Sequence, residues 1–436
     1  MRWIAIFVAV LSLGGCAIFL PDRIHYSLID RSAGPSGTPH GATPVPSGQD
    51  QGGVIAIALS GGGSRASVFG AAALEVLAEA GIAQQAAYIS SVSGGGFPAA
   101  YYAIHKPRPC DLATRRSSPC TSDDFAVFKK TMRYDYLRDI SIRQVLRPNR
   151  FSSPTRRLTS LQNALDHKIV RDATFGDLPE EPILLINGAR YDDGRRFVFS
   201  NLAIPEGAVD LDRFSHPVLR TASFSLPGCT RAVPDDFSVA LALATSAGFP
   251  PLLGPASLEI PSTCDGGALH YWHIGDGGIL ENTGIETIED YAANGVGERA
   301  RILAKGGKLI IFSVDAGRST PTNQMMQTRN LKLWTTDPGR VVEIAGMRAR
   351  GYREVALQQT RDDNPLDIEI ISMRYTDAQL TQWPNSCGRR KADPAAIRAE
   401  LTSVPTSLKI SRCHADLIEM AARDVVTRVL IKRGLR

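Results

Sequence analysis

The sequence predicts an α/β fold around a mainly parallel sheet, on the evidence of three neighbouring segments. Residues 54–60 (VIAIALS) and 87–92 (AYISSV) are short apolar runs with β-branched residues, a pattern typical of buried parallel strands. Between them, residues 67–80 have a helical pattern that ends at Gly81. Strand, helix and strand within about 40 residues make a βαβ unit, whose two strands run parallel.

Both predicted strands end in glycine-rich turns. Residues 61–65 (GGGSR) follow the first strand, and residues 93–96 (SGGG) follow the second. The carboxyl ends of parallel strands meet at one edge of the sheet, where open α/β sheets bind their ligands. We therefore expect the glycine loop of residues 61–63 to lie beside Ser93.

The rest of the chain supplies further elements of the same fold. Apolar or alternating runs predict strands at residues 182–190, 196–201, 268–274, 308–315 and 366–375. The strand at 308–315 is expected near the sheet centre. Helical patterns predict helices at residues 97–105, 237–247 and 414–431. Residues 105–160 are polar and basic, which favours a solvated loop region over the cleft, with a lid as the alternative.

Ser93 is the candidate nucleophile. A serine on a sharp turn between a strand and a helix projects from the backbone surface, and small neighbours let a substrate approach it. The amides of Gly61, Gly62 and Gly63 can donate hydrogen bonds to an oxyanion that develops on an attacked carbonyl. The structural alternative is a turn serine in a glycine-rich cap, since Ser91 stands where G-x-S-x-G has its first glycine.

The glycine loop also fits a dinucleotide-binding fingerprint. Gly61, Gly63 and Ala66 have the G-x-G-x-x-A spacing after a strand. A dinucleotide-binding domain has an acidic residue at the end of the next strand to hold the ribose hydroxyls. Here that strand ends in residues 92–94 (VSG), without a carboxylate. The sequence therefore predicts no nucleotide cofactor.

Asp276 is the candidate base, because a nucleophilic serine needs a proton acceptor. None of the eight histidines lies in a glycine-rich turn of the catalytic kind. Asp265 and Asp276 each begin a D-G-G turn, but Asp265 follows Cys264 and precedes a strand, which indicates a hairpin or disulfide loop. Asp276 ends that strand, where its carboxylate can reach the same sheet edge as Ser93. Asp265, in the other D-G-G turn, serves as the control residue for the assignment of Asp276 as the base.

Four stretches, taken in order, resemble the patatin-like phospholipase family, which is related to the catalytic domain of cytosolic phospholipases. They are residues 60–65 (SGGGSR), 91–95 (SVSGG), 244–251 (ATSAGFPP) and 275–284 (GDGGILENTG), with a weaker echo at 404–408 (VPTSL). The resemblance spans roughly residues 54–320. It implies a three-layer α/β/α fold with a mainly parallel central sheet, and one lipid acyl hydrolase domain over residues 54–436.

The resemblance also implies the chemistry. Ser93 and Asp276 would form a catalytic dyad, the glycines of residues 61–63 match the oxyanion loop, and Arg65 matches a supporting arginine. Ser93 would attack the ester carbonyl of a lipid or phospholipid while Asp276 accepts its proton. Water would then release the fatty acid from an acyl-enzyme. Ser91 and Ala66 replace glycines of the family pattern. No metal is predicted, because no cysteine or histidine group has zinc-ligand spacing.

The N-terminus has the parts of a secretory signal. Arg2, an apolar run at residues 3–13 and two glycines precede Cys16. The run is shorter than the ~20 residues of a membrane-spanning helix. Residues 13–16 (LGGC) resemble the lipobox of bacterial lipoproteins, which implies acylation of Cys16, for example with palmitate. An ordinary secretory signal is the alternative. Ala17 follows in place of an aspartate, so the resemblance implies the outer membrane.

We expect residues 1–15 to be a signal peptide and residues 16–53 to be a lipidated N-terminus and flexible linker. Residues 31–53 are rich in Gly, Pro, Ser and Thr and bury too little apolar surface to order themselves. The acyl chains, rather than a basic protein face, would then hold the protein at the membrane of a bacterial cell envelope.

The overall composition excludes two classes of protein. A hydrophobic fraction of 43% with 21% charged residues excludes an intrinsically disordered chain. The 49 basic residues are nearly balanced by 44 acidic ones, and the formal net charge of the 436 residues is only +5. No nucleic-acid partner is predicted from such a balance.

Six of the seven cysteines remain after Cys16. An exported protein meets an oxidising compartment, so an even number favours disulfides. Each of three pairings closes one local loop: Cys110–Cys120, Cys229–Cys264 and Cys387–Cys413. The alternative is that some of these cysteines are buried free thiols.

Two other functions stay open at this point. An acyltransferase on the same fold would use an alcohol in place of water, and the sequence does not separate it from a hydrolase. A catalytically idle lipoprotein would use the fold to bind lipid or partner proteins. The lipid headgroup and the oligomeric state are not specified by the sequence.

Overall fold

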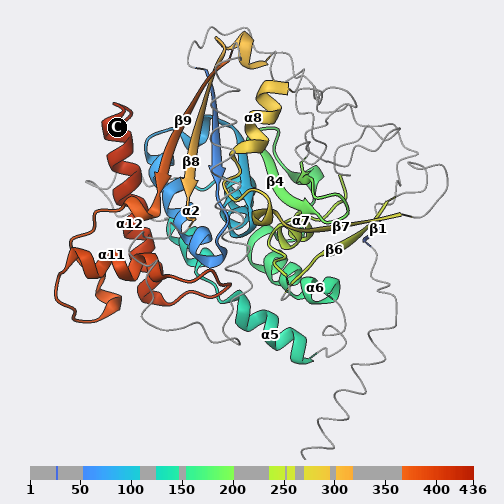
Figure 1. Ribbon diagram of the computed structural model, residues 1–436, viewed down its shortest axis with the longest axis horizontal. Coiled ribbons are helices and arrows are strands. Elements are labelled where there is room, and N and C mark those ends of the chain that lie inside the picture. Colours follow the sequence, from blue (N-terminus) through green and yellow to red (C-terminus); the bar gives the residue numbers. More distant parts are fainter. Residues whose placement is uncertain are drawn as a thin grey trace, which may run out of the picture.

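The computed structural model describes residues 26–27, 53–108, 124–146, 154–200, 235–250, 253–260, 270–294, 301–317 and 366–436. Within these residues, one sheet of nine strands forms the centre of the protein (Figure 1). Cys16, Asp265 and the cysteines at 110, 120, 229 and 264 lie outside the described residues.

The sheet is mainly parallel in its central part. Its strands follow the order β1 (Tyr26–Ser27), β6 (Ala256–Ile260), β7 (His270–Asp276), β4 (Ile183–Arg190), β3 (Ala86–Val92), β2 (Val54–Leu59), β8 (Lys308–Asp315) and β9 (Asp367–Arg374). From β4 to β9 every neighbouring pair is parallel. β7 pairs antiparallel with β4 and β6, and β5 (Arg196–Phe199) pairs antiparallel with β4.

The predicted βαβ unit is confirmed. Strands β2 and β3 are parallel and joined through helix α2 (Gly63–Glu79), and β3 runs through a short 3₁₀ turn into α3 (Gly96–His105). The prediction for the strand at residues 308–315 is confirmed in its bounds but wrong in its place. β8 lies between β2 and the edge strand β9, away from the sheet centre.

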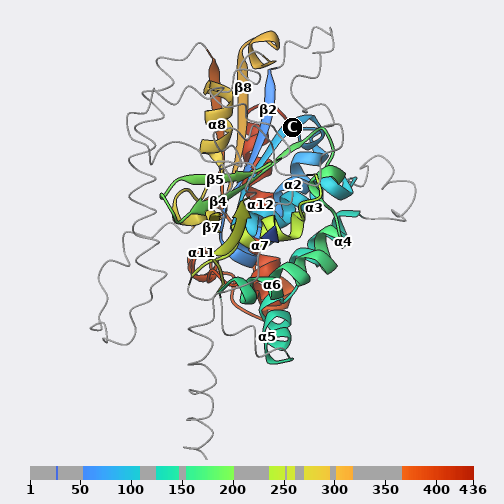
Figure 2. The same cartoon turned by 90° about the vertical axis from the view of Figure 1, so that its right-hand side faces the viewer.

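Helices cover both faces of the sheet, which gives three layers. On one face, α2, α3, α4 (Asp124–Met132), α6 (Pro154–Leu165), α7 (Val239–Ser246) and α12 (Arg412–Lys432) supply the larger core. On the other face, α8 (Ile285–Asn294) packs through Ile288 and Tyr291 (Figure 2). Alternate residues of β2 point to opposite faces, so Ile57 joins the larger core and Ala58 the smaller one.

The region after α3 is helical, which corrects the expectation of solvated loops at residues 105–160. Helices α4, α5 (Tyr136–Leu146) and α6 account for most of the described part of it. Phe125, Phe128 and Met132 are fully buried and recur at helical spacing on the inner face of α4. The outer face of α4 is mainly polar. Because of these polar residues, the apolar stripe was not recognised as a helical pattern in the sequence.

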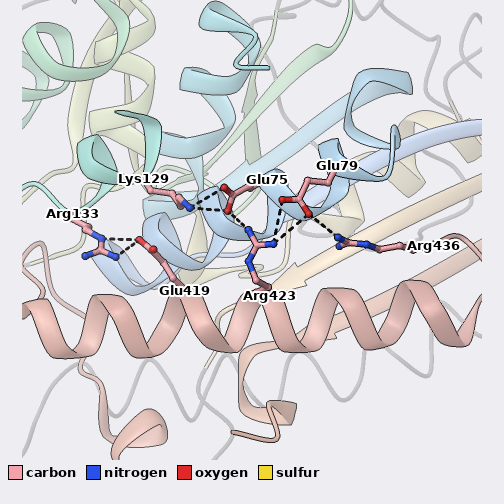
Figure 3. A network of polar contacts seen from close by, with 7 residues as sticks. All are labelled: Glu75, Glu79, Lys129, Arg133, Glu419, Arg423 and Arg436. Atoms are coloured by element: carbon pink, nitrogen blue, oxygen red, sulfur yellow. Dashed lines mark hydrogen bonds and ion pairs between the residues drawn. The ribbon is translucent and has the colours of Figure 1, made fainter. Parts of the chain in front are cut away.

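A network of ion pairs holds α2 against the C-terminal helix (Figure 3). Glu75 of α2 accepts from Lys129 Nζ and Arg423 Nη2, both at 2.9 Å. Glu79, one turn later, pairs with Arg423 at 3.2 Å and with Arg436 at 2.9 Å. Glu75 is largely buried, so the two cations compensate the cost of removing its charge from water. The glycine loop lies at the N-terminus of α2, so this network anchors the helix that carries it.

A disulfide closes the loop before the C-terminal helix. Cys387 and Cys413 are bonded, as predicted, and are 26 residues apart in the chain. Helix α11 (Pro394–Ser403) and the segment that leads into α12 lie within this loop. No helix among the described residues has the length and apolar character needed to span a bilayer.

Candidate active site

Ser93 stands on a strained turn at the end of β3. Its φ of 51° lies in the left-handed region, which residues with a side chain rarely adopt. The next two residues must be glycine, because a Cβ on Gly94 would lie 2.2 Å from the Gly63 carbonyl oxygen and one on Gly95 would lie 2.5 Å from the Leu59 carbonyl oxygen. Gly94 and Gly95 pack closely against neighbouring backbone, and the Ser93 side chain projects from the end of β3 toward Asp276 at the end of β7.

Asp276 ends β7 and faces Ser93 directly. Ser93 Oγ donates a hydrogen bond to Asp276 Oδ2 at 2.8 Å, and the Gly278 amide donates to Oδ1 at 2.8 Å. Both carboxylate oxygens therefore have a donor. The antiparallel pairing of β7 with β4 puts Asp276 opposite Gly188, two strands away from Ser93 in the sheet order. The two residues that the sequence selected as nucleophile and base thus lie together.

Burial sets the electrostatics of this pair. Asp276 is 4% exposed, and removal from water raises the pKa of its carboxyl to about 6. The hydrogen bonds from Gly278 and Ser93 favour the carboxylate and oppose this rise. A carboxylate with a pKa near neutrality is a stronger proton acceptor than an ordinary aspartate and is still ionised at pH 7.

The glycine loop lies against Ser93, but its three amides are not equivalent. A Cβ on Gly61 would come within 3.3 Å of Ser93 Cβ, so the loop passes directly beside the candidate nucleophile. The Gly61 amide donates to the Asn282 carbonyl oxygen at 2.9 Å. This corrects the expectation that all three glycines serve an oxyanion, because the Gly61 amide already has an acceptor.

Gly62 and Gly63 are the remaining donors of the loop. Their φ values of 144° and 59° suit glycine, and within the described residues neither amide has an acceptor. The Gly63 amide also stands at the N-terminus of α2, where the helix dipole favours negative charge. These two amides have the chemical character required for an oxyanion hole.

Arg65 supports the glycine loop through hydrogen bonds to residues after β8 and before α12. Its guanidinium donates to the Ala316 carbonyl oxygen at 2.9 Å, to the Val404 carbonyl oxygen at 2.7 Å and to Thr406 Oγ1 at 3.2 Å. Ser64 adds a backbone bond to the Ser407 carbonyl oxygen at 2.7 Å. The segment at 404–408 that echoes the family pattern therefore braces the first turn of α2.

Two polar residues near Ser93 were absent from the sequence-based site. Asn187 of β4 donates from Nδ2 to Ser90 Oγ and to the Ser91 carbonyl oxygen, both at 2.9 Å. Ser246, at the end of α7, accepts a hydrogen bond from the Ser93 amide at 2.9 Å. The sequence could have indicated Asn187, because an asparagine inside an apolar strand is buried and buried polar groups need specific hydrogen-bond partners. Ser246 lay in the 244–251 stretch without an assigned role.

His273, three residues before Asp276 on β7, has an acidic partner of its own. His273 makes a 2.8 Å contact from Nδ1 to Asp192 Oδ1 on the exposed side of β7. In the part of the chain that the structure describes, no group of three or more His, Cys, Asp or Glu side chains is arranged to hold a metal ion.

Comparison with known proteins gives one family and several remote structural likenesses. Residues 57–288, more than half of the chain, match the family Patatin, described as patatin-like phospholipase. No curated protein matches the sequence. Similar solved structures include human GIVD cytosolic phospholipase A2, at a TM-score of 0.40 and 12% identity, with 88% of this chain and 62% of that chain covered.

Two further structures of the same human enzyme contain methyl gamma-linolenyl fluorophosphonate. With that inhibitor, the TM-score is 0.42 at 12% identity, with 90% of this chain and 59% of that chain covered. With the inhibitor and terbium chloride, the TM-score is 0.40 at 12% identity, with 88% and 59% covered. The chain thus spans about three fifths of the length of these structures.

Proposed function

The chain belongs to the patatin-like phospholipase family, and on that premise we propose that it is a lipid acyl hydrolase with Ser93 as nucleophile and Asp276 as base. The observation that carries the assignment is the 2.8 Å hydrogen bond from Ser93 Oγ to Asp276 Oδ2 in a buried site. A hydroxyl bonded to a carboxylate of raised pKa needs no histidine to lose its proton, since the acceptor is already in contact.

The reaction takes two steps. Ser93 Oγ attacks the ester carbonyl of a lipid while its proton passes to Asp276 Oδ2. The carbonyl π electrons move onto oxygen, and the amides of Gly62 and Gly63 stabilise that oxyanion. Collapse of the tetrahedral intermediate expels the alcohol, which takes the proton from Asp276, and leaves an acyl-enzyme. Water then adds to the acyl group, gives its proton to Asp276, and releases the fatty acid as Ser93 regains its proton.

The lipid anchor is a second part of the proposal. Acylated Cys16, after removal of residues 1–15, would hold the enzyme at the bacterial outer membrane, beside its substrate. The support is the LGGC pattern at residues 13–16 and the Gly- and Pro-rich segment that follows. Several acyl chains on one residue would bind firmly, because each buried CH₂ contributes ~0.8 kcal/mol.

The hydrolase proposal is tested with the purified full chain on phospholipid vesicles. We expect release of free fatty acid by the wild type and none by Ser93→Ala. Fatty acid transferred to an added alcohol in preference to water would indicate an acyltransferase. Binding of vesicles without any fatty acid release would indicate a lipid-binding protein and would refute the hydrolase.

The anchor is tested by metabolic labelling with radioactive palmitate in a bacterial host. The wild type should carry label and partition into detergent, and Cys16→Ser should do neither. Wild-type protein without label, or processing that the signal-peptidase inhibitor globomycin does not block, would show an ordinary secretory signal.

A further inference from the structure

The C-terminal turn of α7 contacts the backbone of both proposed catalytic residues. The Ser93 amide donates to Ser246 Oγ at 2.9 Å, and the Asp276 amide donates to the Gly248 carbonyl oxygen at 3.3 Å. Residues 246–248 therefore connect the end of β3 to the end of β7. This short segment is thus bonded to the backbone of both residues whose side chains share the 2.8 Å hydrogen bond.

The Ser246 hydroxyl has partners in two directions. It accepts from the Ser93 amide and donates to the Asn187 carbonyl oxygen at 2.5 Å. Ser246 is fully buried, so its hydroxyl is shielded from bulk solvent. Because the hydroxyl hydrogen is committed to Asn187, a lone pair of Oγ stays directed at the Ser93 amide.

The Ser93 amide needs such an acceptor. With φ at 51°, its backbone leaves the ladder of β3, and the strained conformation persists only if the surroundings hold it. A buried amide without an acceptor costs free energy, and the chain would relax toward an ordinary φ to regain a partner. Such relaxation would move Ser93 Oγ away from Asp276.

We infer that Ser246 is a positioning residue that holds Ser93 in its strained, reactive conformation. The inference rests on the proposed function, since it concerns the nucleophile of that reaction. Asn187 has an auxiliary part, because its carbonyl oxygen orients the Ser246 hydroxyl and its Nδ2 fixes the β3 residues just before Ser93.

Thr245 provides a matched control. It precedes Ser246 on α7, is fully buried, and its hydroxyl has no hydrogen-bond partner among the residues that the structure describes. Thr245→Val and Ser246→Ala each remove one buried hydroxyl from the same turn of the same helix. Only the second removes an acceptor of the Ser93 amide.

The test compares the two variants with the wild type on a soluble monomeric ester and with a fluorophosphonate probe. Ser246→Ala should lower kcat and the rate of Ser93 labelling by about tenfold or more, with KM nearly unchanged, because one buried hydrogen bond is lost at the nucleophile. Thr245→Val should keep both rates near those of the wild type. Melting curves of both variants, compared with that of the wild type, establish whether each variant is folded.

Amide hydrogen exchange of the peptide that contains Ser93 gives a readout that does not depend on activity. Exchange should be faster in Ser246→Ala and unchanged in Thr245→Val. Labelling of Ser246→Ala at the wild-type rate, or equal losses in both variants, would overturn the positioning role. A wild type that does not label at Ser93 at all would instead refute the proposed function, and the catalytic meaning of the positioning role with it.

Discussion

Ser93 and Asp276 are joined by a direct hydrogen bond of 2.8 Å, although they are 183 residues apart in the chain. Ser93 is 8% exposed and Asp276 is 4% exposed. The hydroxyl contacts the carboxylate without an intervening histidine, so in the proposed reaction the carboxylate itself accepts the proton. The remaining carboxylate oxygen is held by the Gly278 amide, which fixes the plane of the base.

Substitution of either member of this pair should remove activity. Ser93→Ala deletes the nucleophile, and Asp276→Asn keeps the shape but removes the basic oxygen. We expect both to reduce fatty acid release by at least about 10³-fold, as the loss of a catalytic pair does elsewhere. Asp265→Asn, in the other D-G-G turn, should keep most of the activity. Equal loss at Asp265 would contradict the assignment of the base.

The rate should depend on pH through Asp276. The base acts only when ionised, and burial raises its pKa to about 6. We therefore expect log(kcat/KM) to rise with unit slope below about pH 6 and to level off above it. The measurement is a pH profile on a soluble ester over a range in which the protein stays folded. A plateau that extends unchanged down to pH 4.5 would show an ordinary or unused carboxyl.

The same pKa shift predicts a cost in stability. The folded-state pKa of Asp276 lies above its unfolded value, so its contribution to stability is greatest below about pH 4 and is lost as the pH rises through about 6. Asp276→Asn removes this cost, which is about 3 kcal/mol at most for a shift of this size. The melting temperature of the variant should exceed that of the wild type at pH 7.5.

Comparison at low pH supplies the control for this effect. At pH 4 both the variant and the wild type have an uncharged side chain at position 276, so the difference in melting temperature should shrink. A variant that is less stable than the wild type at pH 7.5 would mean that the ionised carboxylate stabilises the folded protein. That result would contradict the stability cost expected from its raised pKa.

Much of the fold and site was predictable because parallel strands and glycine turns leave clear local patterns. The apolar run before Gly61 and the one before Ser93 predicted β2, β3 and their shared edge. The position of β8 was not predictable in this way, because the strand order depends on crossovers between distant segments. The helices at 124–146 were missed because polar residues outnumber the apolar stripe that includes Phe125 and Phe128.

Within the site, the sequence predicted which residues take part, but it did not predict which hydrogen bonds they make. The glycine pattern indicated an oxyanion loop. Only the structure shows that the Gly61 amide already donates a hydrogen bond to the Asn282 carbonyl oxygen. Arg65 matched a family position, and its actual partners come from residues 316 and 404–406. The role proposed for Ser246 had no local signal, since the Ser93 amide that it contacts lies 153 residues away in the chain.

The Cys387–Cys413 disulfide should stabilise the C-terminal region. It closes a loop that contains Val404 and Thr406, the residues that hold Arg65. Replacement of both cysteines by serine should lower the free energy of unfolding by about 3.5 kcal/mol, the chain-entropy value for a loop of this length. Urea denaturation of the double variant measures this change. An unchanged midpoint would mean that the bond contributes nothing to stability.

Covalent labelling asks whether Ser93, activated by Asp276, forms an acyl-enzyme. The purified chain is treated with a fluorophosphonate, digested, and analysed by mass spectrometry. We expect one adduct, on the peptide that contains Ser93, with none in Ser93→Ala and much slower formation in Asp276→Asn. An adduct on another residue, or a folded wild type that forms none, would refute the role proposed for Ser93.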